Sequence, residues 1–467
     1  MRKAGVLLAI FSLPGSFKIG DLGESAYQWL DLLKANKVSL WQILPLNPVG
    51  YGNSPYQAYS AFAGDEIYIS IEKLYKSLNL ELDHTSLESS YVDYKEARKL
   101  KEKYLYKAFK HFKKNNDYYD FNNKAFWLDD YVEFMALKNQ NDNKPWTEWK
   151  EFKADKRRMD YHRFLQFIFF QQWQSLKNKA KANGVEIIGD IPIYLGHDSA
   201  EVYNNQSQFT LNKDGSLAKV AGVPPDYFSE DGQLWGNPLY NWIEVAKDNY
   251  QLWIDRLKWN QEMFDLIRLD HFRGFDTYWE VDAEEKTAKN GIWRLGPSHA
   301  FFNKMYEEVK ALNLIVEDLG ELRAEVLQIR DDFNLPGMQV IQFLLSKKEI
   351  KQIKSKKDNY LVYSGTHDNP PLSEVVDNLE LKQRQELFLS LELYSKSLRD
   401  NLVYFCLSLD AKWAIIPIQD LIDEDSNSRI NTPGTIGSPN WEYKLKDFNK
   451  AQQGLKKYKK MIEITKR

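Results

Sequence analysis

Two kinds of hydrophobic pattern alternate along most of this chain of 467 residues. In one, apolar side chains recur every three to four residues, which places them on one face of a helix. Residues 25–36 are an example, because Ala26, Trp29, Leu30 and Leu33 share a face. In the other, a short apolar run rich in β-branched residues predicts a buried strand. Three further helical stretches each lead into such a run, residues 161–183, 249–263 and 298–313.

Eight apolar runs are strand candidates, and they begin at Gly5, Val38, Val185, Leu266, Leu314, Gly337, Asn359 and Lys412. Strands that mostly alternate with helices in this number predict an α/β fold, a (β/α)8 TIM barrel. We therefore expect residues 1–467 to form a single barrel domain with two insertions around its C-terminal mouth. The first is a mainly helical subdomain at 48–160 after the second strand. The second is a loop-rich subdomain at 196–248 after the third strand.

The first seventeen residues allow a second interpretation, because a basic tip precedes the apolar residues 6–13 and resembles a secretory signal. The apolar part is short, however, and a small-x-small cleavage site does not follow it. Since the helical stretch 25–36 comes soon afterwards, we expect a first strand here. No run approaches the roughly 18 apolar residues of a membrane-spanning helix.

Charge and cysteine content narrow the class of protein further. The 63 Lys and Arg residues nearly balance the 66 Asp and Glu residues, leaving a net charge of -3. A neutral substrate fits this balance better than nucleic acid or an anionic membrane. The basic segment 445–467 could touch an anionic surface, but we expect a solvated terminal helix. Cys406 is the single cysteine and no Cys/His cluster has zinc spacing, so we expect a cytoplasmic protein without metal or cofactor.

Acidic side chains stand at the C-terminal ends of four predicted strands: Asp190, Asp270, Glu317 and Asp368. Barrel enzymes place their catalytic groups on that face. For Asp190, and for Asp318 directly after Glu317, we favour a structural role, since aspartate often caps the following helix. Three histidines lie close to these acids in sequence, and together they could form a hydrogen-bonding cage around a polar ligand: His197, His271 and His367.

Paired carboxyl groups without metal or thiol suit acetal chemistry, in which one acid protonates a leaving oxygen and another carboxylate attacks the anomeric carbon. Alternation along a strand puts Arg268 and Asp270 on one face, so the guanidinium should lower the pKa of Asp270 and keep it ionised. A structural ion pair at a strand end is the alternative. Glu317 follows Ile315 and Val316, and burial among them should raise its pKa and keep it protonated.

Seven motifs of this sequence resemble those of one family. This family is the 4-α-glucanotransferases called amylomaltase or disproportionating enzyme, family 77 of the glycoside hydrolases. They occur in the family's order and span nearly the whole chain. They are GYGNSPYQAYSAFAGD from Gly50, GDIPIYLGHDSAEVY from Gly189, GVPPDYFSEDGQLWGNPLYNW from Gly222, RLDHFRG from Arg268, VEDLG from Val316, GTHDN from Gly365 and NTPGT from Asn431.

The resemblance implies retaining transfer of an α-1,4-glucan segment from a maltooligosaccharide or a starch- or glycogen-type glucan to the 4-OH of a glucan or glucose acceptor. It implies that Asp270 is the nucleophile of a covalent glucosyl intermediate, Glu317 the acid/base and Asp368 the third carboxylate. Further residues would bind the sugars: Arg268, His271, His367, Tyr56, Asp190, Asp226, Trp235 and, more distantly, Tyr51. An acceptor platform could involve Tyr51, Tyr56, Tyr227, Phe228 and Trp235.

Two departures from the family pattern concern the subsites. Pro370 and Pro371 follow THDN where Asp-Thr is usual, which removes two backbone donors and biases Asn369 toward an extended conformation. NWEYKL from Asn440 replaces a more arginine-rich stretch. Two alternatives remain at this stage, an α-amylase-like hydrolase in which water is the acceptor, and a glucan-binding protein without activity.

Overall fold

The computed structural model describes residues 2–83, 89–225, 229–357 and 359–467. Its centre is a sheet of eight parallel strands, each starting at or within two residues of a run predicted above. Their burial is almost continuous, as in a sheet covered on both faces. The strands are Lys3–Leu7 (β1), Leu40–Gln42 (β2), Glu186–Ile191 (β3), Leu266–Leu269 (β6), Leu314–Val316 (β9), Gly337–Val340 (β10), Tyr360–Tyr363 (β11) and Trp413–Pro417 (β12).

The strands form a nearly closed barrel in the order β10-β11-β12-β1-β2-β3-β6-β9. At the seam between β9 and β10, the Val316 N–H donates to the Pro336 carbonyl at 3.0 Å. β1 pairs with β12, so the first strand of the chain lies beside the last one. The (β/α)8 prediction is therefore confirmed, and β1 is the first strand expected from the N-terminal pattern.

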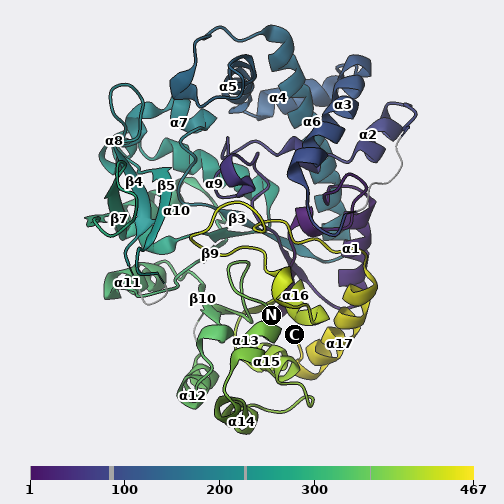
Figure 1. Cartoon of the computed structure of the whole chain (residues 1–467), viewed down its shortest axis with the longest axis vertical. Coiled ribbons are helices and arrows are strands. Elements are labelled where there is room, and N and C mark those ends of the chain that lie inside the picture. The colour runs from purple at the N-terminus through teal and green to yellow at the C-terminus, as the bar shows by residue number, and fades with distance from the viewer. Residues whose placement is uncertain (1, 84–88, 226–228, 358) are drawn as a thin grey trace.

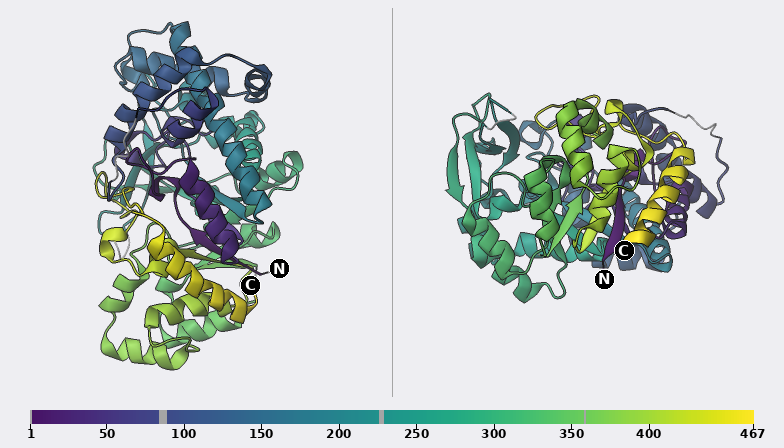
Figure 2. Two further views of the ribbon diagram at one scale, coloured as in Figure 1. Left: turned by 90° about the vertical axis from the view of Figure 1, so that its right-hand side faces the viewer. Right: turned by 90° about the horizontal axis from the view of Figure 1, so that it is seen from below.

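Helices precede seven of the barrel strands and cover the outside (Figure 1). These are Glu24–Ala35 (α1), Lys156–Ala182 (α6), Gln251–Met263 (α9), Ser298–Glu308 (α10), Ala324–Asp332 (α11), Lys347–Ser355 (α12) and Leu398–Ser408 (α15). In α1 the buried face is the predicted one, Ala26, Trp29, Leu30 and Leu33. The basic terminal helix Asn449–Thr465 (α17) lies beside α1 and also packs against α15, burying five apolar side chains and Gly454 (Figure 2).

One predicted helix is shorter than its apolar pattern. Residues 298–313 have helical spacing throughout, but α10 ends at Glu308. Val309 is already extended and Ala311 adopts a φ of 56°, so the chain turns toward β9. Val309 and Leu312 are buried by this turn rather than by another helical turn. The apolar spacing therefore predicted the burial of Val309 and Leu312 correctly, but it placed the end of the helix too far along the chain.

The remaining helices lie in the segments that connect these strands and covering helices. Helices cluster at the top of Figure 1: Ile71–Ser77 (α2), Tyr94–His111 (α3), Asn116–Lys124 (α4), Leu128–Gln140 (α5) and Ala200–Asn204 (α7). The others are Trp242–Lys247 (α8), Leu372–Asn378 (α13), Leu381–Ser390 (α14) and Ile418–Ile422 (α16). No helix within the described ranges is long and apolar enough to cross a lipid bilayer.

A second sheet is absent from the sequence prediction. It is antiparallel, has the order β5-β4-β7-β8, and stands at the left of Figure 1. Its strands are Lys219–Val223 (β4), Gln233–Pro238 (β5), Thr277–Asp282 (β7) and Ile292–Leu295 (β8). The stretch predicted as turns and loops therefore contains β4 and β5. β4 pairs with β7, which lies more than fifty residues further along the chain, and local patterning could not reveal that pairing.

Candidate active site

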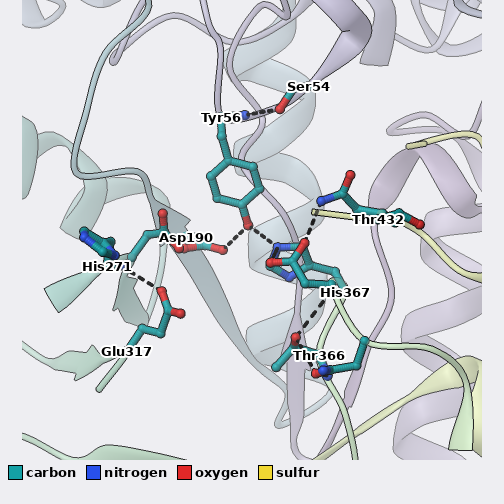
Figure 3. A network of polar contacts seen from close by, with 12 residues as sticks. Ser54, Tyr56, Asp190, His271, Glu317, Thr366, His367 and Thr432 are labelled. Atoms are coloured by element: carbon teal, nitrogen blue, oxygen red, sulfur yellow. Dashed lines mark hydrogen bonds and ion pairs between the residues drawn. The ribbon is translucent and has the colours of Figure 1, made fainter. Parts of the chain in front are cut away.

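The predicted acids meet at one end of the barrel because parallel strands carry them there. Asp190 ends β3, Asp270 follows β6, Glu317 follows β9, and Asp368 lies in the loop after β11. The register between β3 and β6 places Asp190 opposite Arg268. Figure 3 shows Asp190, Glu317 and His367 on separate segments of the chain that approach one another. The structure thus brings these predicted residues to one end of the barrel.

Arg268 is the cation of this cluster, and only 3% of its side chain is exposed. Its guanidinium donates to both oxygens of Asp190 at 2.8 and 2.7 Å and to Asp270 at 2.9 Å. A further ion pair joins it to Glu317 at 3.1 Å. One arginine thus holds three carboxyl groups in fixed relative positions, which is the pre-organisation that a reacting site requires.

Asp270 and Glu317 lie together because both are paired with Arg268, at 2.9 and 3.1 Å. Burial raises the pKa of Asp270 well above its usual value; Arg268 opposes this shift and the charge of Glu317 adds to it. Burial acts on Glu317 in the same sense, but Arg268 and the His271 N–H help to outweigh it, and the pKa falls to about 2. The two carboxyl groups therefore titrate as a pair, with the pKa of Asp270 shifted upward and that of Glu317 downward.

These pKa shifts run opposite to the sequence prediction, which expected a lowered pKa for Asp270 and a raised pKa for Glu317. The prediction assumed that Ile315 and Val316 surround the Glu317 carboxyl group. Those side chains belong to the strand, whereas the carboxyl group faces Arg268 and accepts the His271 N–H at 2.8 Å. The charges that decide the pKa values come from neighbouring strands, and their distances are not readable from one segment.

His271 contacts Glu317 through its backbone N–H and the ring of Trp235 through its imidazole. Its backbone has a φ of 47°, a left-handed conformation that is uncommon for a non-glycine residue and is often found at functional sites. Burial lowers the pKa of its imidazole to about 4, so the ring is neutral near pH 7. The ring stands edge-on to Trp235, with centroids 4.8 Å apart. Two residues predicted to bind sugar are therefore in contact.

Tyr56 connects the Arg268 cluster to the loop after β11. Its hydroxyl group donates to Asp190 at 2.7 Å and lies 2.9 Å from Nε2 of His367 (Figure 3). The two rings are stacked, with centroids 5.4 Å apart. Burial raises the pKa of Tyr56 well above its usual value, so the hydroxyl keeps its proton. Asp190 thus serves the site through Arg268 and Tyr56 rather than as a helix cap.

Asp368 is held by residues that the sequence analysis did not select. The Asn431 amide donates to its carboxylate at 2.7 Å, and Arg429 donates to its backbone carbonyl at 2.7 Å. Nε2 of His367 lies 3.4 Å from the other carboxylate oxygen. The side chain of Asp368 is 40% exposed, so it remains accessible to a ligand. Asn431 begins the NTPGT motif, which is the signal that could have identified it.

Other predicted residues have different surroundings. His197 does not join the cage, because it bonds the Gly215 carbonyl at 2.8 Å and packs against Trp146. Asp318 has a structural role, since it accepts the Met338 N–H at 2.6 Å and pairs with Arg330. Asp226, Tyr227 and Phe228 lie outside the described residues. For Tyr51 only the backbone is described, in the short 3₁₀ helix Tyr51–Asn53.

Both departures from the family pattern are accommodated near the site. Pro371 immediately precedes α13, and the Gln342 side chain donates to the Pro370 carbonyl at 2.9 Å. In the second stretch, Asn440 accepts the Thr432 N–H at 2.9 Å. The ring of Trp441 lies 5.8 Å from that of Tyr56. Within the described part of the chain, no group of three or more His, Cys, Asp or Glu side chains could hold a metal ion.

Comparisons with known proteins agree with this geometry. Residues 8–450 match the model of glycoside hydrolase family 77, described as 4-alpha-glucanotransferase. The chain is 40% identical to a 4-alpha-glucanotransferase of Aquifex aeolicus, over 98% of each chain. It is 36% identical to one of Thermus thermophilus, covering 100% of this chain and 99% of that one. An amylomaltase of Streptococcus agalactiae, solved in complex with acarbose, superposes with a TM-score of 0.94 at 32% identity over 100% of both chains.

Proposed function

This chain belongs to the 4-alpha-glucanotransferases of glycoside hydrolase family 77, and from that premise we propose that it works by a retaining double displacement with Asp270 as nucleophile. The observation that carries the proposal is that one guanidinium, that of Arg268, contacts both Asp270 at 2.9 Å and Glu317 at 3.1 Å. Retaining enzymes keep their two carboxyl groups close, whereas inverting enzymes separate them by about 6.5–9.5 Å to admit a water molecule. Two carboxyl groups paired with a single guanidinium support the first class.

The first half-reaction requires one proton on the carboxyl pair, carried by Glu317. Asp270 is then a carboxylate beside Arg268, which donates to it at 2.9 Å. Glu317 then gives this proton to the glycosidic oxygen as that bond to the anomeric carbon breaks. An Asp270 oxygen forms the new bond to the same carbon. The products are a glucosyl ester of Asp270 and a shortened glucan with a free 4-OH.

The second half-reaction reverses these steps with another glucan. Glu317, now ionised, removes the proton from the acceptor 4-OH, and that oxygen displaces Asp270 from the anomeric carbon. Each inversion cancels the other, so the α configuration is retained. His271 lies beside Glu317 and is neutral near pH 7, so it can donate or accept a hydrogen bond to a sugar hydroxyl.

The remaining residues are assigned to substrate binding and distortion. Asp368 and His367 would hold two hydroxyls of the sugar whose bond is cleaved, since both project from the loop after β11. Trp235 offers a ring beside His271 for stacking against a pyranose. Asp226 and Tyr51 keep their proposed subsite roles from the family resemblance. The helical insertion 48–160 and the loop-rich insertion 196–248 would frame this cleft.

We propose maltooligosaccharides and α-1,4-glucans of the starch or glycogen type as substrates, and maltose and glycogen metabolism in the cytoplasm as the setting. The related Streptococcus agalactiae enzyme was solved with acarbose. Transfer must outcompete water, which is present at about 55 M. Binding that aligns an acceptor hydroxyl can supply an effective molarity of about 10⁵ M or more.

Incubation with maltotriose separates this function from its two alternatives. A transferase gives glucose and a ladder of longer oligosaccharides while total reducing ends stay almost constant, because each transfer breaks and makes one glycosidic bond. A rise in reducing ends in step with maltotriose loss, with no product longer than maltotriose, would identify a hydrolase. Binding of maltotriose without any product would identify a glucan-binding protein.

A further inference from the structure

The loop between β11 and α13 carries His367 and Asp368, and both of its ends are bonded to one buried side chain. The Ser364 hydroxyl, directly after β11, donates to Asp420 Oδ2 at 2.5 Å. The Leu372 N–H, at the start of α13, donates to Asp420 Oδ1 at 2.7 Å. Asp420 belongs to α16, which follows the last barrel strand, and is 3% exposed.

The double proline explains why the second anchor falls at Leu372. Pro370 and Pro371 have no N–H, so Leu372 offers the first backbone donor after Asn369. The N-terminus of α13 has no side-chain cap from Pro371, its preceding residue. The carboxylate of Asp420 takes the place of that cap from another segment of the chain. Because of the two prolines, the Leu372 N–H is the first backbone donor available at this end of the loop, and it is bonded to Asp420.

Between the two anchors the loop is braced by its own side chains. Asn369 accepts both the N–H and the hydroxyl of Thr366, at 2.8 and 2.9 Å. The Thr366 hydroxyl in turn accepts the Asp368 N–H at 3.3 Å. A braced loop moves as one piece, so a shift at its ends is transmitted to the Asp368 carboxylate rather than absorbed between them.

From this arrangement we infer that Asp420 is a positioning residue of the transfer reaction. It acts by fixing the position and orientation of the loop that bears His367 and Asp368. The inference rests on the role of Asp368 proposed above. Arg429 and Asn431 hold Asp368 directly. Asp420 holds the two ends of the same loop, so the third carboxylate is fixed both by its own contacts and through its loop.

The test compares Asp420→Ala with Asp420→Asn under maltotriose turnover. Alanine leaves the Ser364 hydroxyl and the Leu372 N–H without their acceptor. A misplacement of about 1 Å can cost about 100-fold in rate, so kcat should fall by about that factor while KM changes less than about threefold. Asparagine can accept the Leu372 N–H and donate to Ser364, so Asp420→Asn should recover kcat to within about fivefold.

A matched control is Asp265→Ala. Asp265 also accepts a backbone N–H, that of Ile187 at 2.8 Å, but it precedes β6 at the opposite end of the barrel. It should lower the unfolding temperature and leave kcat unchanged. If Asp420→Ala behaved in the same way, with kcat within about threefold of the wild type, Asp420 would be structural only and the inference would be wrong.

A double-mutant comparison separates this inference from the proposed role of Asp368, on which the inference rests. In an Asp368→Asn background, Asp420→Ala should cause no further fall in kcat, because its effect passes through Asp368. An Asp368→Asn enzyme with normal kcat would overturn the proposed role of Asp368 itself. If Asp420→Ala does not fold, Ser364→Ala decides: kcat should fall at least about threefold, and an unchanged kcat would refute the positioning role.

Discussion

Replacing Glu317 by glutamine removes the proposed acid and keeps most of its contacts. Oε2 of Glu317 accepts the His271 N–H at 2.8 Å and pairs with Arg268 at 3.1 Å. A glutamine can place its amide oxygen there and direct its NH₂ group toward Asp270. That substitution also removes the charge and the hydrogen bond of Glu317, two of the causes that raise the pKa of Asp270. The pKa of Asp270 should therefore be lower in this variant than in the wild type.

The magnitude follows from the leaving group. A positioned general acid contributes about 10²–10⁴-fold, so kcat on maltotriose should fall by about 10³-fold, or about 4 kcal/mol of activation free energy. Fluoride needs little protonation to leave. With α-glucosyl fluoride, the rate of the first half-reaction should therefore stay within about tenfold of the wild type.

Rapid mixing of Glu317→Gln with α-glucosyl fluoride measures that half-reaction directly. Without a base to activate the acceptor, the glucosyl enzyme should accumulate after a burst of about one fluoride per enzyme. Glu308→Gln is the matched control, since Glu308 is paired only with Lys304 on α10 and should show normal kinetics on both donors. Equal losses on maltotriose and on the fluoride would refute the assignment of Glu317 as acid.

Two further variants test the carboxyl groups on and near the site. Asp270→Asn should lower kcat on both donors by at least about 10⁴-fold with an unchanged circular dichroism spectrum, and a near-normal rate would contradict the nucleophile assignment. Glu201, buried and bonded by Ser60 and the Ala61 N–H, has its pKa raised by burial to about 7. The folded protein therefore keeps this proton while the unfolded chain loses it, so the stabilisation is complete below the unfolded pKa and disappears as pH rises through about 7. The free energy of unfolding of the wild type should fall relative to Glu201→Gln by about 3 kcal/mol between pH 4.5 and 7, measured by urea denaturation. Parallel profiles would show that Glu201 is ionised throughout.

The barrel could be predicted from the sequence because its strands are buried on both faces. Such strands are continuous apolar runs, as in Trp413–Pro417, and they stand out against amphipathic helices. The antiparallel sheet lacks this signal: all four residues of β8 are exposed and β5 alternates irregularly. Its two hairpins are joined by the pairing of β4 with β7 across more than fifty residues, which a local pattern does not contain.

The candidate site was predictable to the extent that its acidic side chains follow barrel strands. Asp270, Glu317 and Asp368 were selected by that position, and the structure pairs Asp270 and Glu317 with the same arginine. The directions of their pKa shifts were not predictable, since Arg268 divides its charge among three carboxyl groups from different strands. Arg429, Asn431 and Asp420 were missed for a related reason: each reaches the loop of Asp368 from about fifty to sixty residues further along the chain.

The central claim is a covalent bond between Asp270 and the transferred sugar. Mass spectrometry of Glu317→Gln, quenched in acid after mixing with α-glucosyl fluoride and then digested, tests it most directly. The account predicts a peptide containing Asp270 that is heavier by one glucosyl residue, and its absence from the Asp270→Asn/Glu317→Gln double variant. Release of a full equivalent of fluoride with no labelled peptide, or a label on another residue, would contradict it.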